Sequence, residues 1–226
     1  MFRAVIFDFD GVITDSEILH YRAFNMALAK HGVEITKKDY YKKYLGLTDA
    51  DFFDQLISEN ILHATKDDIK SLLTQKNHSF EHLARTGGHI IDGVIDFLEM
   101  LKLNKIPMTI CSGALRSEIE LILHKARIRS YFEEITSAEE VARGKPDPQG
   151  FLLALKKLNK LFTPEIKSSD CVVVEDSHWG LEAAQSAKMH TIAVTNSYDA
   201  HELGMAEKVV HKLSDIKMPD LQNLCL

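Results

Sequence analysis

The sequence predicts an α/β fold, with a Rossmann-like, doubly wound parallel sheet and an α-helical cap domain inserted after the first strand. Two observations predict the sheet: short apolar runs recur along the chain, and amphipathic helical segments separate them. A third observation predicts the inserted domain, because one stretch of about 70 residues is helical throughout and contains no convincing strand.

Each predicted strand is a continuous apolar run that ends in an acidic residue, Ser, Thr or Asn. The four clearest runs are residues 4–9, 107–111, 171–174 and 191–194. Runs of this kind suit strands that are buried on both faces, as in a parallel sheet. The helices predicted around the later runs cover residues 92–103, 117–126, 148–158 and 180–187.

The helical stretch, from about Ser16 to about Arg85, is too long for an ordinary crossover between parallel strands, which takes about a dozen residues. We therefore expect a discontinuous core domain of residues 1–15 and 87–226 and a cap domain of residues 16–86. Asp15-Ser16 is the expected outgoing hinge and helix cap. Thr86-Gly87-Gly88 is the expected return hinge, because paired glycines tolerate large backbone changes.

Charge and composition exclude several classes of protein. The chain of 226 residues carries 27 Lys and Arg against 33 Asp and Glu, a formal net charge of −6, so it lacks the cationic surface that nucleic acids and anionic membranes attract. Hydrophobic residues make up 45 % and charged residues 27 %, which is ordinary globular usage and excludes disordered and fibrous classes. The expected partner is a small molecule, not a nucleic acid or a membrane.

Targeting and redox signals favour the cytoplasm. No apolar run approaches the ~20 residues of a membrane span. The apolar stretch before Asp8 is too short for a signal peptide. Cys111, Cys171 and Cys225 are scattered and odd in number, which disfavours a disulfide framework and fits a reducing compartment. Nothing in the sequence requires an oligomer, so we expect a monomer.

The first apolar run ends in Asp8-Phe9-Asp10-Gly11. Ligands of open parallel sheets collect beyond the carboxyl ends of the strands. Residues two apart in an extended strand point to the same face, so Asp8 and Asp10 are both expected to face one ligand. Two solvated acids in a loop are the plainer alternative. It is weakened because Asp8 interrupts an apolar run, where a buried carboxylate is costly without a cation or partner.

A second acidic pair, Glu175-Asp176, follows the apolar run at 171–174. Together with Asp8 and Asp10, it would bring four carboxylates to one edge of the sheet, where they repel one another unless a cation lies among them. Oxygen ligands favour Mg²⁺. Zinc is disfavoured because the cluster contains no His or Cys.

Two other candidates have weaker individual signals. Ser112-Gly113 offers a hydroxyl and an unhindered backbone N–H at the end of the second run, which suit an anionic oxygen. Lys145 lies between Gly144 and Pro146, just before a predicted helix. In isolation, Ser112 is as well explained as a helix cap and Lys145 as a surface lysine.

Four motifs in order resemble those of the haloacid dehalogenase-like hydrolase superfamily: Asp-Phe-Asp-Gly-Val-Ile, Ser-Gly, Lys-Pro-Asp-Pro and Glu-Asp-Ser. The helical insert after the first motif resembles the subgroup with a small α-helical cap, which includes beta-phosphoglucomutase and phosphoglycolate phosphatase-like enzymes. The resemblance covers nearly the whole chain. It implies phosphoryl transfer through a covalent aspartyl-phosphate.

The resemblance also implies roles for the acidic residues. Asp8 is expected to be the nucleophile, because a carboxylate attacks phosphorus without prior deprotonation. Asp10 is expected to protonate the leaving oxygen and then activate water, with its backbone carbonyl on the metal. Mg²⁺ is expected to be held by Asp8, Asp10 and Asp176, with Glu175 close by.

The phosphate ligands implied by the resemblance are Ser112, Gly113 and Lys145, which would hold the equatorial oxygens in the transition state. Arg116, just after Ser112-Gly113, is a further candidate because arginine binds phosphate in a bidentate manner. The expected substrate is a small phosphomonoester, such as a sugar phosphate.

Residues of the predicted cap bear on the choice of substrate. His20 and Lys76 match a histidine and a lysine that, in the phosphoglucomutase branch, couple cap closure to the general acid. That branch also has an arginine for a second phosphate in the cap loop, where this sequence reads Leu45-Gly46-Leu47-Thr48-Asp49. An acid at the matching position repels a second phosphate, so Asp49 favours a phosphatase over a mutase. A sugar-phosphate mutase is the alternative, and a non-catalytic binding module is the least favoured.

Overall fold

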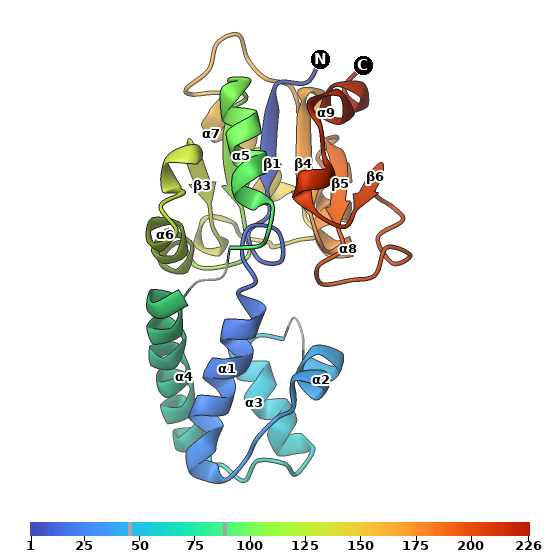
Figure 1. Ribbon diagram of the computed structural model, residues 1–226. Helices are drawn as coiled ribbons and strands as arrows, with labels where there is room; N and C mark the ends of the chain where they lie inside the picture. Colours follow the sequence, from blue (N-terminus) through green and yellow to red (C-terminus); the bar gives the residue numbers. More distant parts are fainter. Residues whose placement is uncertain (45–46, 88–89) are drawn as a thin grey trace. The chain divides into compact units, whose positions relative to one another are not determined.

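The computed structural model describes residues 1–44, 47–87 and 90–226, and only the backbone of residues 66 and 85–87. It divides into two compact units, one of Met1–Asp15 with His89–Leu226 and one of Ser16–Gly88. Figure 1 shows the sheet of the first unit and the helices of the second. Gly88 of the predicted hinge, and Leu45 and Gly46 of the loop before Asp49, lie outside the described residues.

The first unit is built on a six-stranded sheet with the order β3-β2-β1-β4-β5-β6. All neighbouring strands are parallel. The strands are β1 (Ala4–Phe7), β2 (Met108–Cys111), β3 (Glu134–Thr136), β4 (Cys171–Glu175), β5 (His190–Val194) and β6 (Lys208–Val210). The strand order reverses at β1, with β2 and β4 as its neighbours, so the predicted doubly wound parallel sheet is confirmed. Open sheets bind ligands at such a reversal.

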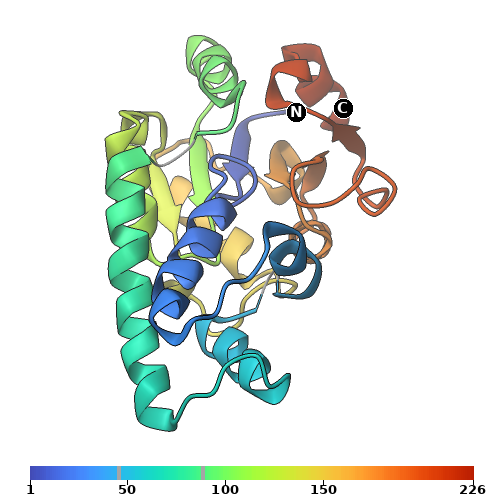
Figure 2. The ribbon, with the colours of Figure 1, turned by 60° about the horizontal axis from the view of Figure 1, so that its bottom comes forward.

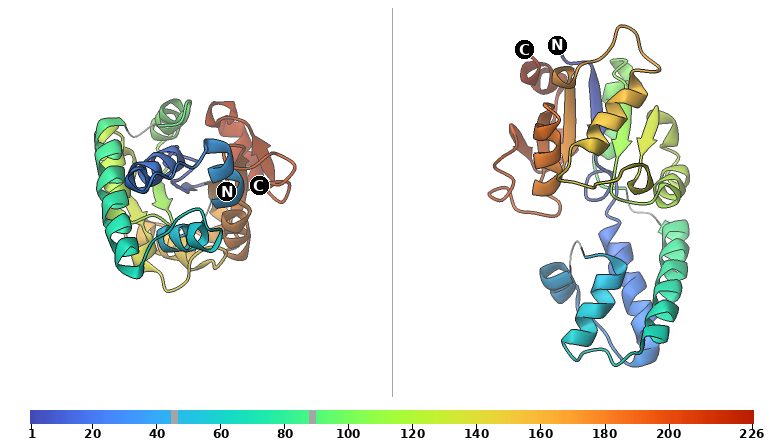
Figure 3. Two further views of the ribbon diagram at one scale, coloured as in Figure 1. Left: turned by 90° about the horizontal axis from the view of Figure 1, so that it is seen from below. Right: turned by 180° about the vertical axis from the view of Figure 1, so that it is seen from behind.

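Helices cover both faces of this sheet. They are α5 (Val94–Leu103), α6 (Arg116–Lys125), α7 (Gln149–Leu158), α8 (His178–Ser186) and α9 (Met218–Leu224). Short 3₁₀ turns span Arg129–Tyr131, Ala138–Glu140, Ser168–Asp170 and Leu213–Asp215. Helix α7 packs on β2 and β3 and α8 on β4 and β5, whereas α5 lies on the opposite face (Figures 1 and 3).

The apolar runs become strands because both faces of the sheet are buried. On one face, Ala4 and Ile6 of β1 join a core cluster that includes Phe151 of α7. On the other face, the ring of Phe7 meets those of Phe97 and Phe132 edge-on, with centroids 5.9 and 5.8 Å apart. The side chains on both faces of each strand therefore need to be apolar. Such strands lack the alternation of polar and apolar residues that is typical of a half-exposed strand.

The second unit contains the helices α1 (Glu17–Leu28), α2 (Lys37–Asp39), α3 (Asp49–Ser58) and α4 (Lys66–Gly87), with a 3₁₀ turn at Ala29–His31 and a π-helical turn at Tyr40–Tyr44. Helices α1 and α4 lie side by side (Figure 2). Aromatic residues fill the core: the rings of Phe24 and Phe52 stack at 3.8 Å, and Phe53 packs against both. In the part of the chain that the structure describes, no helix is long and apolar enough to cross a bilayer.

Two strands, β3 and β6, were not predicted. Each has only three residues and contains a charged one, Glu134 or Lys208. They form the two edges of the sheet, where short polar strands are common. Each predicted strand also differs at one boundary, because β1 ends at Phe7, β2 begins at Met108, β4 extends to Glu175 and β5 begins at His190.

Candidate active site

The predicted acidic residues meet at the carboxyl ends of β1 and β4. Phe7 is in register with Val174, so these adjacent strands end together. The backbone N–H of Asp8 donates to the carbonyl of Val174 at 2.9 Å, which continues the ladder by one residue. Asp8 and Asp176 directly follow the two strands, and Glu175 ends β4.

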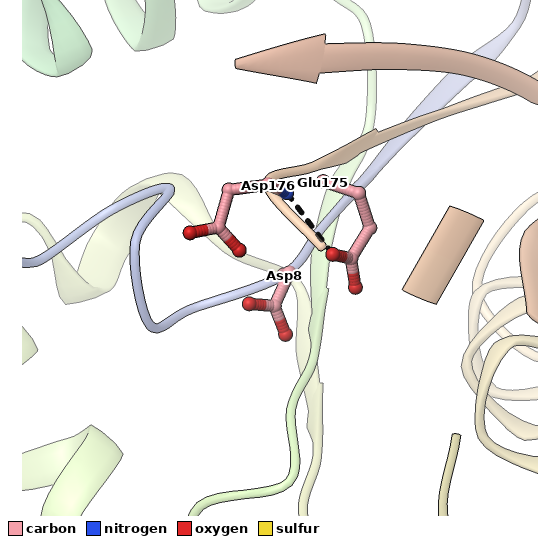
Figure 4. Close-up of side chains that lie close together, drawn as sticks. All are labelled: Asp8, Glu175 and Asp176. Carbon is pink, nitrogen blue, oxygen red and sulfur yellow. Dashed lines mark hydrogen bonds between the residues drawn. The ribbon is translucent and has the colours of Figure 1, made fainter. Parts of the chain in front are cut away.

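Three of these acids form one buried cluster (Figure 4). Carboxylate oxygens of Asp8, Glu175 and Asp176 lie within 4.8 Å of one another. The residues are 6 %, 0 % and 4 % exposed, so little water screens their mutual repulsion. The pKa of Asp8 is raised to about 7, chiefly by burial and also by the charges of Glu175 and Asp10, whereas Lys145 lowers it. Burial and the Glu175 carboxylate raise the pKa of Asp176 well above its usual value.

Lys145 is the cation that the chain itself supplies to this cluster. Its Nζ donates to Asp8 Oδ1 and to Glu175 Oε1. Burial by itself would lower the pKa of Lys145, but these two carboxylates raise it well above its usual 10.5. One ammonium group thus faces three carboxylates. The remaining negative charge, carried by oxygen atoms alone, fits a divalent cation such as Mg²⁺.

Glu175 is held from both of its carboxylate oxygens. Oε1 accepts from Lys145, and Oε2 accepts from the N–H groups of Asp176 and Ser177 at 3.0 Å and from the Ser177 hydroxyl at 2.9 Å. A methyl group at Gly180 would overlap the Glu175 carboxylate, so only glycine allows α8 to approach so closely. These contacts suit Glu175 to hold Lys145 in place. Asp8 and Asp176 are therefore the more suitable ligands for a cation.

Ser112 follows β2 and lies next to Asp10. Its Oγ donates to Asp10 Oδ2 at 3.4 Å and accepts from the N–H of Ala114 at 2.9 Å. Ser112, Gly113 and Lys145 also line one cavity, of about 190 Å³. The fold therefore brings the hydroxyl and the glycine of one motif and the lysine of another into one cavity.

Comparison with known proteins identifies the family. A family model for haloacid dehalogenase-like hydrolases matches residues 5–194. The chain belongs to this family. It is a hydrolase of this family, and several of its curated relatives are phosphatases.

Two of those relatives act on small phosphorylated molecules. The 5-amino-6-(5-phospho-D-ribitylamino)uracil phosphatase of Arabidopsis thaliana chloroplasts is 34 % identical over 173 residues, 76 % of this hydrolase and 44 % of the plant enzyme. The hydrolase thus spans less than half the length of that relative. A phosphorylated carbohydrates phosphatase of Thermotoga maritima is 30 % identical over 191 residues, 84 % of this chain and 83 % of its own.

Solved structures share the fold over almost the whole chain. A beta-phosphoglucomutase from Clostridium difficile is 26 % identical, with a TM-score of 0.79 over 100 % of this hydrolase and 97 % of that enzyme. CbbY from Rhodobacter sphaeroides, determined in complex with phosphate, is 23 % identical, with a TM-score of 0.82 over 98 % and 100 % of the two chains. The CbbY likeness concerns the fold alone.

Arg116 is placed differently from the other predicted phosphate ligands of this hydrolase. Its Nη2 donates to the carbonyl of Ile135 at 2.6 Å and to Glu140 at 2.9 Å, and Nη1 lies 3.8 Å from Glu120. These contacts join α6 to the end of β3 and the turn after it. In the structure, Arg116 thus connects α6 to β3 and the following turn, and its contact with phosphate stays a prediction.

His20, Lys76 and Asp49 come together inside the helical unit of the hydrolase. Lys76 is 1 % exposed, donates to Asp49 Oδ2 at 2.7 Å and lies over the rings of Phe24 and Phe80. The His20 ring packs on Phe80 at 4.3 Å. Burial and the Lys76 charge lower the pKa of His20 to about 3, so the imidazole is neutral.

Sequence reasoning missed the residues that hold the acids. Ser177 caps α8 through the N–H of Gly180 at 3.1 Å and also donates to Glu175. Asn196 and Ser197, which follow β5, contact Gly11 and Asp176. The available signal was that the fourth apolar run ends in polar residues, as the runs before Asp8 and Glu175 do.

Proposed function

We propose that this protein is a Mg²⁺-dependent phosphatase that hydrolyses a small phosphomonoester, such as a sugar phosphate, through an aspartyl-phosphate on Asp8. The observation that carries the proposal is the buried Asp8 carboxylate, at the end of β1 between Lys145 and Asp176. The relatives from Arabidopsis and Thermotoga, both named as phosphatases of small metabolites, support this reaction class.

In the first step, a carboxylate oxygen of Asp8 forms a bond to phosphorus as the bond from phosphorus to the leaving oxygen breaks. The ionised carboxylate is the nucleophile, so the charge of Lys145 promotes the step by stabilising that form. When bound by Asp8 and Asp176, Mg²⁺ supplies positive charge that offsets the charge of nucleophile and phosphate.

Asp10 moves the protons in both steps. It gives a proton to the leaving oxygen as the alcohol departs. It then takes a proton from the water that attacks the phosphorus of the aspartyl-phosphate. The bond from phosphorus to Asp8 breaks, inorganic phosphate leaves and the Asp8 carboxylate is restored.

Ser112, Gly113 and Lys145 bind the phosphate oxygens. The three residues line one cavity next to the acidic cluster, and they offer a hydroxyl, a backbone N–H and an ammonium group. Such donors stabilise the charge that spreads over the equatorial oxygens during phosphoryl transfer.

The predicted cap, residues 16–86, sets the choice of substrate in this proposal. A sugar-phosphate mutase is the second candidate, because His20 and Lys76 lie in one cluster of the helical unit. The ion pair between Lys76 and Asp49 weighs against it, since it neutralises the lysine and places an acid where a mutase needs a cation.

Release of inorganic phosphate tests the proposal. A panel of sugar phosphates, small organic phosphates and nucleotides is assayed with Mg²⁺ and with EDTA. Asp8→Asn serves as the blank, and Asp96→Asn, an exposed acid on α5, is the matched control. Mg²⁺-dependent release that only Asp8→Asn loses is the expected result.

Absence of release from every member would overturn the phosphatase. Conversion between sugar-phosphate isomers, with a bisphosphate activator, would then test the mutase. Failure of both assays would leave a binding module.

A further inference from the structure

The loop after β5 contacts the acidic cluster at Asp176, whereas Lys145 bonds to Asp8 and Glu175. The Asn196 side-chain amide donates to the carbonyl of Gly11 at 2.6 Å. The hydroxyl of the next residue, Ser197, donates to Oδ2 of Asp176. Two neighbouring side chains thus bind the turn after Asp10 and the acid after β4.

Gly11 shows how tightly these parts pack. Its φ of +76° lies in the left-handed region, where glycine is favoured. A methyl group on Gly11 would overlap the Asp176 carboxylate and lie 2.9 Å from Ser197 Oγ. The Asp176 carboxylate therefore lies against both the Gly11 turn and the Ser197 hydroxyl.

We propose that Ser197 is a positioning residue for the cation site, holding the Asp176 carboxylate in the orientation that binds Mg²⁺. This inference rests on the proposed function. Lys145 is engaged with Asp8 and Glu175, so Ser197 is the side-chain donor that the structure records on Asp176. A donor on one carboxylate oxygen fixes the rotation of the group and directs the other oxygen to the cation.

Asn196 supports the same arrangement one step further from the cation. Its bond to the Gly11 carbonyl attaches the loop after β5 to the turn that contains Asp10. Because Asn196 contacts backbone and not a carboxylate, its removal is expected to weaken cation binding less than removal of the Ser197 hydroxyl.

The chain offers a matched control in the same loop. Thr195 also carries a hydroxyl, but its Oγ1 lies 2.9 Å from Nδ1 of His211 and has no recorded bond to Asp176. A variant at Thr195 removes a hydroxyl from the same loop without removing the bond from Ser197 to Asp176. It therefore separates positioning of Asp176 from a general role in loop structure.

The test is binding of Mn²⁺ to the metal-free protein, followed by electron paramagnetic resonance, with Mg²⁺ as competitor. Ser197→Ala is expected to raise the Kd by about 10- to 100-fold, the usual loss when an outer partner of a metal ligand is removed. Ser197→Thr restores most of the affinity because it keeps the hydroxyl, and Thr195→Val binds like the wild type.

Unchanged affinity in Ser197→Ala, or an equal loss in Thr195→Val, would overturn the inference. Ser197→Cys, which preserves volume but donates weakly, is the second variant should Ser197→Ala fail to fold, and wild-type affinity in it would also overturn the inference. Wild-type protein that binds no Mn²⁺ would overturn the proposed function and this inference together. Wild-type binding with unaffected Ser197 variants would overturn this inference alone.

Discussion

Each of the two units contains a lysine paired with an aspartate, but the charge balance around the two lysines differs. In the sheet unit, Lys145 faces three buried carboxylates. In the helical unit, Lys76 faces one carboxylate, that of Asp49, and two aromatic rings. The first cluster keeps an excess of negative charge that suits a cation, whereas the second is neutral. The comparison indicates that the strand ends suit a cation, and that the pair of Lys76 and Asp49 offers no net charge for a second phosphate.

The largest expected effect comes from removing the nucleophile. Asp8→Asn keeps the shape of the side chain but removes the attacking carboxylate, so kcat/KM for the best phosphate ester should fall by at least about 10³-fold. The same variant relieves like-charge repulsion, so at pH 8 in EDTA its melting temperature should rise by about 2 °C or more. Phosphate release and thermal denaturation measure the two effects. Activity near the wild-type level would contradict the covalent mechanism.

Without a bound metal, the excess of negative charge should make the stability of the folded protein depend on pH. The pKa of Asp8 is raised from 3.8 to about 7, so between these values the folded, metal-free protein holds a proton that the unfolded chain has released. Its stability is therefore highest below pH 3.8, as far as this group is concerned, and falls as the pH rises through 7.

Mg²⁺ should remove most of this loss of stability with rising pH, because a bound cation stabilises the ionised carboxylate of Asp8. Melting curves from pH 5 to 8, with Mg²⁺ and with EDTA, check this expectation. Parallel curves would show that no cation binds at Asp8. Asp8→Asn in EDTA is the control, since it lacks the titrating group.

Asp49→Asn should break the neutrality of the helical unit. It leaves the buried Lys76 ammonium without its carboxylate, at an expected cost of about 1–2 kcal/mol in unfolding free energy, reduced from the fully buried case because Asp49 is partly exposed. The freed charge should also lower KM for a bisphosphate relative to a monophosphate. Asp51→Asn is the matched control, because Asp51 lies in the same turn and contacts Thr48. Equal effects in both variants would remove Asp49 from substrate choice.

The smallest effect is expected at a third, more exposed charge cluster. Glu140 binds Arg116 and Lys157, and although burial opposes the shift, the bond from Lys157 contributes to lowering its pKa from 4.5 to about 2. Its contribution to stability is thus present above pH 4.5 and lost as the pH falls through 2. Glu140→Gln should lower the unfolding free energy at pH 7 by less than about 1 kcal/mol and leave KM unchanged. Acid denaturation curves and steady-state kinetics measure both, and a raised KM would point to Arg116 as a phosphate ligand.

The parallel sheet was predictable because its central strands are continuous apolar runs, whereas β3 and β6 were not. The side chains of the central strands are buried on both faces, Ile6 on one and Phe7 on the other, and burial on both faces leaves a clear compositional signal. The edge strands pair on one side only, so a charged residue such as Glu134 is tolerated and hides the strand.

The acidic candidates were predictable for the same reason. A carboxylate that directly follows a buried strand must lie at the edge of the sheet, whatever the details of packing. The helical unit was more difficult, since the pairing of Lys76 with Asp49 joins residues 27 positions apart on different helices. The spacing of apolar residues along a helix specifies which face of the helix is buried, but not which helix packs against that face.

The sequence itself thus determines which segments form the central strands and that acids follow two of them. Buried strands require apolar runs, and Asp8 and Asp176 lie at the ends of two such runs. The tertiary structure alone decided which side chains hold those acids. Glu175 is bound by Lys145, 30 positions earlier in the chain, and Asp176 by Ser197, which lies in the loop after β5. Hydrogen bonds between residues far apart in the chain depend on geometry to within about 0.5 Å, and residue types alone do not encode distances of that precision.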